Sequence, residues 1–407
     1  MSKVNVRKRN NKWQYQFEGA KIDGKRKQIT KSGFRTKKEA LDAEVKALAE
    51  YNNSGFYFTP SEISYSDFLD YWIKNYVEVN LRPNTIALYK IAVTNIKQQL
   101  GIYKIKSITP NILQDYINSL FSSGTKKDYL KKIVSILNLT FKYAVFPCQY
   151  IKENPAQYIS FPKYEKDDTK KIHTISIEEF NTILERFPEN SDYHMPLVIG
   201  FYTGMRIGEI LALTWNDVNF ENKTISVNKA LILNEDNKQW YLGPTKTFAS
   251  NRIISIGDTL LSALQKFKEK QNINQLKYNE YYKLIYTKEE FVHNKKMQRI
   301  CDLYANIPHE NLTLQNMVCC RKNGELLTTN KMKYVSKIIK YELNIDFKFH
   351  CLRHTHATLL IENGANIKDV QTRLGHSNIQ TTLDTYTHST QNSMNSTVNL
   401  FEQISKK

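Results

Sequence analysis

Two polar stretches divide this 407-residue chain and limit how it can fold. The first, 52–62, combines Gly, Pro, Ser and Asn, and the second, 162–171, is charged and shows no apolar periodicity. Both compositions are typical of linkers. We therefore expect three domains, over residues 1–55, 63–162 and 171–407, each with a core of its own.

Positive charge is concentrated in the first domain. Residues 1–60 contain 14 Lys and Arg against 6 Asp and Glu, so they carry +8 of the net charge of +18. A surplus of this size favours a polyanionic partner, either nucleic acid or an anionic membrane. The N-terminus lacks the apolar core of a signal peptide, and no run of about eighteen apolar residues occurs. We expect a cytoplasmic protein that does not span a membrane.

The first domain is predicted to be a small β-sheet followed by one helix. Aromatic side chains recur at every second position of one segment: Trp13, Tyr15 and Phe17. An Asp-Gly turn at 22–25 leads into a second strand at 25–31. Thr36 and Glu39 then form the capping-box pattern that begins a helix.

The second domain is predicted to be a helical bundle. Four segments keep helical spacing of apolar residues, with Pro or Gly between them: 65–77, 82–100, 109–122 and 125–145. Their polar faces mix Lys with Tyr, Asn and Thr, side chains that contact phosphates and sugars. A solvated helix face has the same composition, so no single DNA contact is predicted here.

The third domain opens with buried helices. Ser176 and Glu179 form a second capping box, and the apolar stretch 195–218 predicts a helix pair interrupted at 203–205. Arg206 is anomalous in this stretch, because an unpaired buried charge is strongly destabilising. Its anionic partner is either Glu209, three positions later, or a bound anion.

Strands and an insertion follow. Three alternating segments predict one small antiparallel sheet over 224–257, with Lys246 in the turn before the last strand. Residues 263–318 are polar and rich in Tyr and Lys, and we interpret them as an insertion with helical content. The fold class is therefore multidomain α+β: a small N-terminal sheet plus helix, a helical bundle, and a mainly α domain with a small antiparallel sheet.

The stretch HCLRHTHATLL, 350–360, places three histidines beside an arginine. His350 and His354 have the i, i+4 spacing of a zinc motif, and His356 could join them. No Glu stands between the first two, however, and Arg353 would put a cation beside the metal. A phosphate suits these residues better, because Arg353 offers a fork of donors and His350 can exchange a proton near neutral pH.

Six residues in chain order resemble the catalytic set of the tyrosine recombinases, the phage integrase family. They are Arg206 in TGMRIGEILAL, Lys246 in PTKTFASNR, His350 and Arg353 in HCLRHTHAT, His376 in RLGHSN, and Tyr386 in TLDTYTH. The resemblance covers the whole chain, whose layout is similar to that of integrases of prophages and conjugative transposons. It implies an arm-type DNA-binding domain at 1–55, a helical core-binding domain at 63–162, and a catalytic domain at 171–407 with a C-terminal tail helix.

The resemblance also implies the chemistry. Tyr386 would be the nucleophile that stores the DNA link as a covalent 3′-phosphotyrosine. A phenol has a pKa near 10, so His350 would act as its base, while Lys246 would protonate the leaving 5′-hydroxyl.

The other three residues would hold the phosphate. Arg206 and Arg353 would clamp its non-bridging oxygens, and His376 would add a hydrogen bond. The set implies no metal and no other cofactor. Gly204 and Gly375 precede two of these segments and suit close backbone turns.

The implied function is DNA integration and excision of a mobile element. The expected partners are double-stranded DNA with core and arm attachment sites, a homotetramer that passes through a Holliday junction, and an excisionase or host DNA-bending protein. A protein with these DNA partners is expected in the bacterial cytoplasm, associated with the nucleoid. Two alternatives stay open: a DNA-relaxing enzyme like type IB topoisomerases, and a DNA-binding regulator without catalysis. The basic module argues against the first, and the complete catalytic set argues against the second.

The tail, 388–407, is predicted to form an amphipathic helix. Its apolar residues recur at helical spacing: Met394, Val398, Phe401 and Ile404. Such a helix must bury its apolar stripe, either on its own catalytic domain or on a neighbouring protomer. The family resemblance favours docking on the neighbour.

Overall fold

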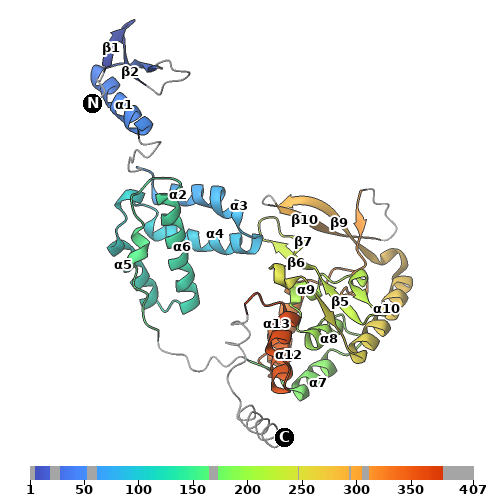
Figure 1. Ribbon diagram of the computed structural model, residues 1–407. Coiled ribbons are helices and arrows are strands. Elements are labelled where there is room, and N and C mark those ends of the chain that lie inside the picture. The colour runs from blue at the N-terminus through green and yellow to red at the C-terminus, as the bar shows by residue number, and fades with distance from the viewer. Residues whose placement is uncertain are drawn as a thin grey trace, which may run out of the picture. The chain divides into compact units, whose positions relative to one another are not determined.

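The computed structural model describes most of the chain (Figure 1). The described residues are 5–18, 28–52, 62–164, 173–245, 247–292, 295–304 and 311–378. The chain forms two compact units, one of Met1–Val77 with Tyr89–Tyr164 and one of Glu78–Leu88 with Glu165–Lys407. None of the described helices is both long and apolar enough to cross a bilayer.

The N-terminal module is a three-stranded antiparallel sheet and a helix, as expected. Its elements are β1 (Asn5–Arg9), β2 (Lys12–Glu18), β3 (Gln28–Phe34) and α1 (Lys37–Asn52). Tyr15 and Phe17 of β2 are buried, and α1 packs on this strand. The helix start keeps half of the capping box: the Glu39 amide donates to Thr36 Oγ1 at 3.1 Å, but the Glu39 carboxylate accepts from the amide of Arg35. The expected turn at 22–25 lies outside the described residues.

The predicted helical bundle is confirmed. Its helices are α2 (Tyr65–Trp72), continued by a π-helical turn η1 (Ile73–Val77) and α3 (Glu78–Asn80), then α4 (Pro83–Leu100), η2 (Ile105–Ser107), α5 (Pro110–Ser122), α6 (Lys127–Val145) and η3 (Pro155–Tyr158). Ser64 and Thr109 cap α2 and α5 with their hydroxyls. Buried aromatic rings fill the space between the helices, and the ring of Tyr65 stacks on Phe141 at 4.9 Å.

The remaining elements belong to the second compact unit. The helices and helical turns are α7 (Ile177–Arg186), α8 (His194–Thr203), α9 (Ile207–Ile210), η4 (Trp215–Asp217), η5 (Phe248–Ser250), α10 (Asp258–Tyr278), η6 (Asn279–Tyr281), α11 (Thr329–Glu342), α12 (His350–Glu362) and α13 (Ile367–Leu374). Of the helix pair expected at 195–218, α8 and the break after it lie where predicted, but α9 ends at Ile210 and the rest of the stretch is a turn, η4 and the start of a strand. Helix α8 is apolar and largely buried, and it lies beside α12 in the core (Figure 1).

The prediction of one sheet over 224–257 is wrong. The strands are β4 (Val218–Asn219), β5 (Thr224–Val227), β6 (Lys229–Asn234), β7 (Gln239–Pro244) and β8 (Arg252–Ser255). Strand β5 pairs with β8 in a three-stranded sheet, whereas β6 pairs with β7 in a five-stranded one. The chain changes sheets at Asn228, whose side chain donates to Asp217 at 2.9 Å. Alternation shows which face of a strand is buried but not which strand is its partner. Residues 224–234 were therefore predicted as a single strand, although they form β5 and β6.

The helical interpretation of 263–318 holds only for its first part. Helix α10 ends at Tyr278, and β9 (Lys283–Val292) then pairs with β10 (Lys295–Tyr304) over ten residues. This hairpin joins β7 on one side and β11 (Thr313–Leu314) on the other, giving the order β11-β9-β10-β7-β6. Tyr and Lys do not distinguish the two states strongly. Burial of one hairpin face decides for strands, through Ile285, Thr287 and Ile300.

Candidate active site

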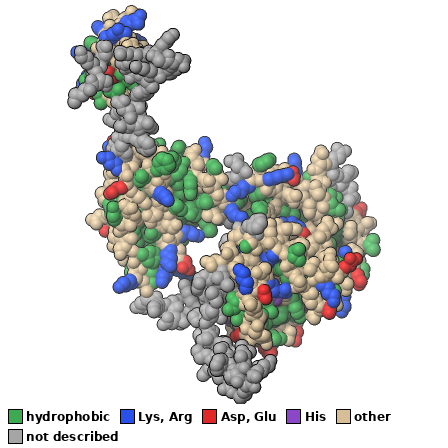
Figure 2. Space-filling view, in the orientation of Figure 1, with side chains coloured by type: hydrophobic (Ala, Val, Ile, Leu, Met, Phe, Trp, Pro, Cys, Tyr) green, Lys and Arg blue, Asp and Glu red, His purple; other side chains and the backbone are tan. Residues whose placement is uncertain are grey.

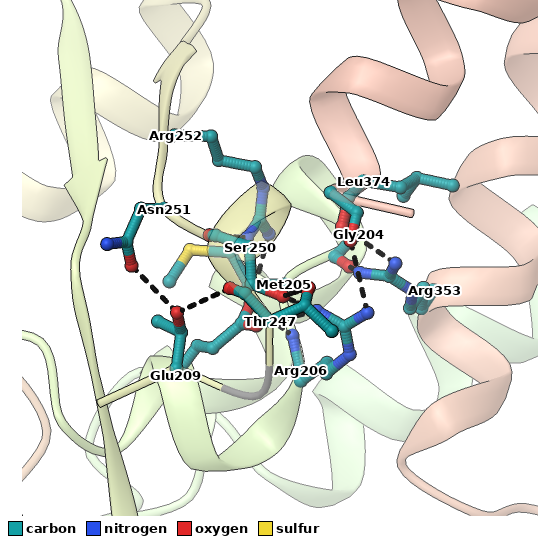
Figure 3. A network of polar contacts seen from close by, with 12 residues as sticks. Gly204, Met205, Arg206, Glu209, Thr247, Ser250, Asn251, Arg252, Arg353 and Leu374 are labelled. Atoms are coloured by element: carbon teal, nitrogen blue, oxygen red, sulfur yellow. Dashed lines mark hydrogen bonds and ion pairs between the residues drawn. The ribbon is translucent and has the colours of Figure 1, made fainter. Parts of the chain in front are cut away.

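Arg353 is the most deeply buried charged residue of the expected site. It lies on the first turn of α12 and only 1% of its surface is exposed. Its Nη1 donates to the carbonyl of Gly204 at 2.8 Å, and its Nη2 donates to the carbonyl of Leu374 at 2.7 Å (Figure 3). These bonds fix the plane of the guanidinium and connect α12 to the ends of α8 and α13.

Arg206 approaches the same place from the other side. It has extended backbone angles just before α9, and its side chain is 26% exposed. Nη1 donates to Glu209 Oε1 at 2.8 Å and to Ser250 Oγ at 3.3 Å, and Nη2 reaches the Gly375 carbonyl at 3.4 Å. The internal partner considered from the sequence, Glu209, is therefore present.

The turn after α13, residues 374–376, is the common support of both arginines. Gly375 ends α13 with φ +69°, and Gly204 ends α8 with φ +65°. A Cβ on Gly375 would lie 2.9 Å from the Ala249 carbonyl oxygen, and one on Gly204 would lie 2.7 Å from Leu374 Cδ2. Both glycines are needed for left-handed backbone and for close approach, as the sequence indicated.

A buried carboxylate joins Arg206 to a second arginine. Glu209 is 3% exposed, and its Oε2 accepts from Arg252 Nη2 at 3.0 Å (Figure 3). Burial alone would raise the pKa of Glu209, but the charges of Arg252 and Arg206 outweigh it and hold that pKa below its ordinary value. Arg252 also donates to the carbonyls of Ser250, at 2.8 Å, and Arg373, at 2.7 Å. One guanidinium thus holds three segments of the site together.

Arg252 was missed from the sequence. Its only signal is its position, two residues before the buried Ile254 and therefore on the inward face of β8. An arginine on an inward face needs a buried acid, and Glu209 fulfils that requirement.

The histidines complete the cluster. Burial, followed by the charges of Arg353 and Arg206 and of the neighbouring histidines, lowers the pKa of His376 to about 4. Its imidazole is therefore neutral at physiological pH. His350, exposed at the start of α12, packs edge to face against His354, with ring centroids 4.6 Å apart. Arg206, Arg353, His350 and His376 are thus brought together.

Two members of the expected set, Lys246 and Tyr386, lie outside the described residues, and their roles remain predictions. The loop that carries Lys246 is described on both sides of it. Thr247 Oγ1 lies 2.9 Å from Ser250 Oγ, which in turn accepts from Arg206. The tail at 388–407 is also outside the described residues.

No three His, Cys, Asp or Glu side chains of the described residues are grouped as a metal site requires. The ring of His356, one member of the alternative zinc set, is turned to the carbonyl of Phe201, 2.8 Å from Nδ1.

Basic side chains lie beside the site and on the N-terminal module. A groove of about 370 Å³ between α11 and the segment before α12 includes Ile207 and Phe349, the neighbours of Arg206 and His350. Four exposed lysines line it: Lys333, Lys337, Lys340 and Lys348. Figure 2 shows further Lys and Arg side chains on the N-terminal module, where β1 exposes Arg7, Lys8 and Arg9.

Comparison with known proteins gives three family matches. The model described as "Phage integrase family" matches residues 171–393, which is more than half of the chain. "Arm DNA-binding domain" matches 5–51, and "Phage integrase, N-terminal SAM-like domain" matches 64–121.

Individual proteins are similar over most of their length. A "Tyrosine recombinase XerC-like" protein of Caldanaerobacter subterraneus is 28% identical over 87% of this chain and 86% of its own. The ICEBs1 integrase of Bacillus subtilis is 26% identical, with the same coverage. Among solved structures, the Tn1549 transposon integrase in complex with a circular intermediate DNA superimposes with a TM-score of 0.63, at 20% identity, over 83% of this chain and 99% of that one. A lambda integrase tetramer bound to a Holliday junction gives 0.53, at 17% identity, over 95% and 97%.

Proposed function

Because the chain belongs to the phage integrase family, whose tyrosine recombinases exchange DNA strands, we propose that it is the integrase of a mobile element. In this proposal it cuts and rejoins double-stranded DNA through a covalent 3′-phosphotyrosine on Tyr386. The observation that carries the proposal is the convergence of Arg206 and Arg353 on the turn at 374–376, which includes the neutral His376.

This arrangement suits a phosphodiester that is being transferred from one DNA strand end to another. Two guanidinium groups held by carbonyl bonds are already oriented, so little reorganisation is needed as charge develops on the phosphate oxygens. His376 has an N–H to offer without adding a charge. The exposed edge position of His350 suits a base that takes the Tyr386 proton, and Lys246 would deliver a proton to the leaving 5′-oxygen.

The three-domain division expected from the sequence is part of the proposal. The family matches support an arm-type DNA-binding domain within 1–55, a core-binding domain starting near 63 and a catalytic domain from 171. The lysines along α11 would neutralise backbone phosphates near the cleavage point. Acting on chromosomal DNA, the enzyme would work in the cytoplasm at the nucleoid.

Assembly is also proposed. The similar structures include one tetramer bound to a Holliday junction and several integrases bound to DNA. We infer that four copies of this chain exchange strands in the same way, with an excisionase or a host DNA-bending protein setting the direction of the reaction.

A suicide DNA substrate tests the function. A nick beside the cleavage point lets the short 5′-hydroxyl strand diffuse away, so the covalent adduct accumulates and is seen as a slower band in denaturing gels. We expect an adduct with wild type and none with Tyr386→Phe, while DNA affinity is nearly unchanged because only the attacking oxygen is lost.

An adduct that persists in Tyr386→Phe would place the nucleophile elsewhere. Fast supercoil relaxation without exchange between two sites would support the topoisomerase alternative. DNA binding with no adduct under any condition would support the non-catalytic regulator.

A further inference from the structure

Arg373, one residue before the supporting turn, makes contacts in four directions. Its Nε donates to His356 Nε2 at 3.0 Å, its Nη1 to the carbonyl of Ser255 at 2.9 Å, and its Nη2 to the carbonyl of Tyr202 at 3.2 Å. Its own carbonyl accepts from Arg252, as described above. The last turn of α13 is thereby tied to α8, α12 and β8.

The contacts of His356 define its protonation state. Nδ1 lies 2.8 Å from a carbonyl oxygen, which only accepts, so Nδ1 must carry the hydrogen. Nε2 faces the Nε–H of Arg373, and a guanidinium only donates, so Nε2 must be the bare acceptor. A doubly protonated imidazole cannot occupy this position.

Other charges around His356 act in the same direction. Burial and the positive charges of Arg373 on α13 and Arg353 on its own helix lower the pKa of His356 to about 4, although the hydrogen bond to Phe201 on α8 opposes them. The ring also lies against the end of α8, because a Cβ on Gly204 would come within 3.0 Å of His356 Cδ2.

We propose that His356 and Arg373 are positioning residues, which set the location of the turn at 374–376 and through it the pose of both phosphate-binding arginines. Arg353 and Arg206 each donate to a carbonyl of this turn, at Leu374 and Gly375. A displacement of the turn therefore moves both guanidinium groups together. The inference rests on the proposed function for its catalytic consequence, but the geometry that it describes can be measured without DNA.

Three variants separate the elements of this proposal. His356→Phe keeps a flat ring and removes both nitrogens, whereas His356→Gln restores an acceptor near the place of Nε2. Arg373→Leu removes the donors and keeps an aliphatic side chain on the helix. Arg321→Leu is the matched control, because Arg321 is also partly buried and bonded, to Asp192 and Glu325, but has no bond to the turn.

The first measurement is the ¹⁵N spectrum of the histidine side chains without DNA. We expect His356 to show the neutral Nδ1–H form at pH 7 and to keep it at pH 5. A His356 ring that is protonated on Nε2, or that titrates with the ordinary pKa of about 6.5, would refute the proposed hydrogen bond between Arg373 and His356.

The second measurement is amide hydrogen exchange at the turn, where Gly375 and His376 both donate to the Gln371 carbonyl. We expect exchange of these two amides to accelerate in His356→Phe and Arg373→Leu, and not in Arg321→Leu. Equal acceleration in the control would mean general loosening of the domain and would refute positioning.

The third measurement is the rate of adduct formation on the suicide substrate. A misplacement of about 1 Å at a reacting group costs on the order of 10²-fold in rate. We expect this loss for His356→Phe and Arg373→Leu, at unchanged DNA affinity, with partial recovery in His356→Gln. Cleavage at the control's rate would reject the catalytic consequence. If wild type forms no adduct, the proposed function fails, while the ¹⁵N and exchange results still decide whether the pair holds the turn.

Discussion

Glu209→Gln is the substitution with the most direct structural prediction. The change keeps the shape of the side chain and removes its charge. The carboxylate is almost fully buried between Arg206 and Arg252, with contacts of 2.8 and 3.0 Å. In the variant an amide NH₂ must face one of two guanidinium groups, and the buried Arg252 and the partly buried Arg206 lose their counter-ion.

The magnitude follows from the burial of the three groups. Removing one partner of a buried ion pair costs about 3–5 kcal/mol. Arg206 is a quarter exposed, so water offsets part of the loss and we expect the lower end, about 3 kcal/mol. For a unit of this size, roughly 2–4 °C of Tm is lost per kcal/mol, which gives a decrease of roughly 6–12 °C. Adduct formation should fall as well, because Arg206 loses the group that orients it.

Calorimetry of wild type and variant tests this stability prediction. Glu342→Gln is the matched control, because it breaks an exposed pair with Arg186 at 2.7 Å and should leave Tm close to wild type. Equal Tm values for Glu209→Gln and wild type would refute the reasoning, since the carboxylate would then contribute nothing to holding the two arginines.

The pH dependence provides a second check. The pKa of Glu209 is lowered in the folded protein from its ordinary value of 4.5. A depressed carboxyl pKa stabilises the fold above the unfolded value and loses that contribution as the pH falls through the folded value. The Tm difference between wild type and Glu209→Gln should therefore be full at neutral pH and shrink below about 4.5.

Three further outcomes concern Lys246, the N-terminal module and the C-terminal tail. Lys246→Ala should cleave normal DNA slowly but recover on a substrate with a 5′-bridging sulfur, which leaves without a proton; equal recovery of Arg353→Ala would remove the general-acid role. Deletion of residues 1–60 should preserve adduct formation at a core site and abolish recombination that needs arm sites, and unchanged binding of arm DNA would show that the domain has another role. Phe401→Ala with Val398→Ala should leave single-site binding intact and weaken synapsis of two sites. A cysteine at position 401 that crosslinks only within its own protomer would show that the tail packs in cis.

Two charged residues of the candidate site could be recognised from the sequence because their neighbours make them unusual. Arg206 was conspicuous because its surroundings are apolar, and Arg353 because of the histidines around it. The contacts that hold them were not predictable in the same way. Their acceptors are main-chain carbonyls of Gly204, Leu374 and Gly375, and any residue type supplies a carbonyl.

Arg252 and Arg373 show the same limit from the donor side. Neither was singled out from the sequence, because polar and apolar residues are mixed around each of them. Their burial is created by segments more than a hundred residues away, as in the bond from Arg252 to the Arg373 carbonyl. The prediction of strand pairing was wrong for a related reason. The alternation in β5 and β6 indicates which side chains point inward but not which strand each one pairs with.

The balance of charge around the turn gives a physical reason for a phosphate site. Three guanidinium groups, those of Arg206, Arg252 and Arg353, donate to the carbonyls of residues 373–375, and Arg373 itself carries a fourth. Glu209 pairs with Arg206 and Arg252. Their other bonds described above go to carbonyl oxygens, to the Ser250 hydroxyl and to His356 Nε2, which are neutral groups that orient a cation. The consequence is visible in the arginines themselves, since burial and a neighbouring arginine lower the pKa of both Arg252 and Arg373. In the proposed function, a phosphodiester brought to this turn would supply negative charge, and the charge that grows on it during strand transfer would be stabilised by donors already fixed in place.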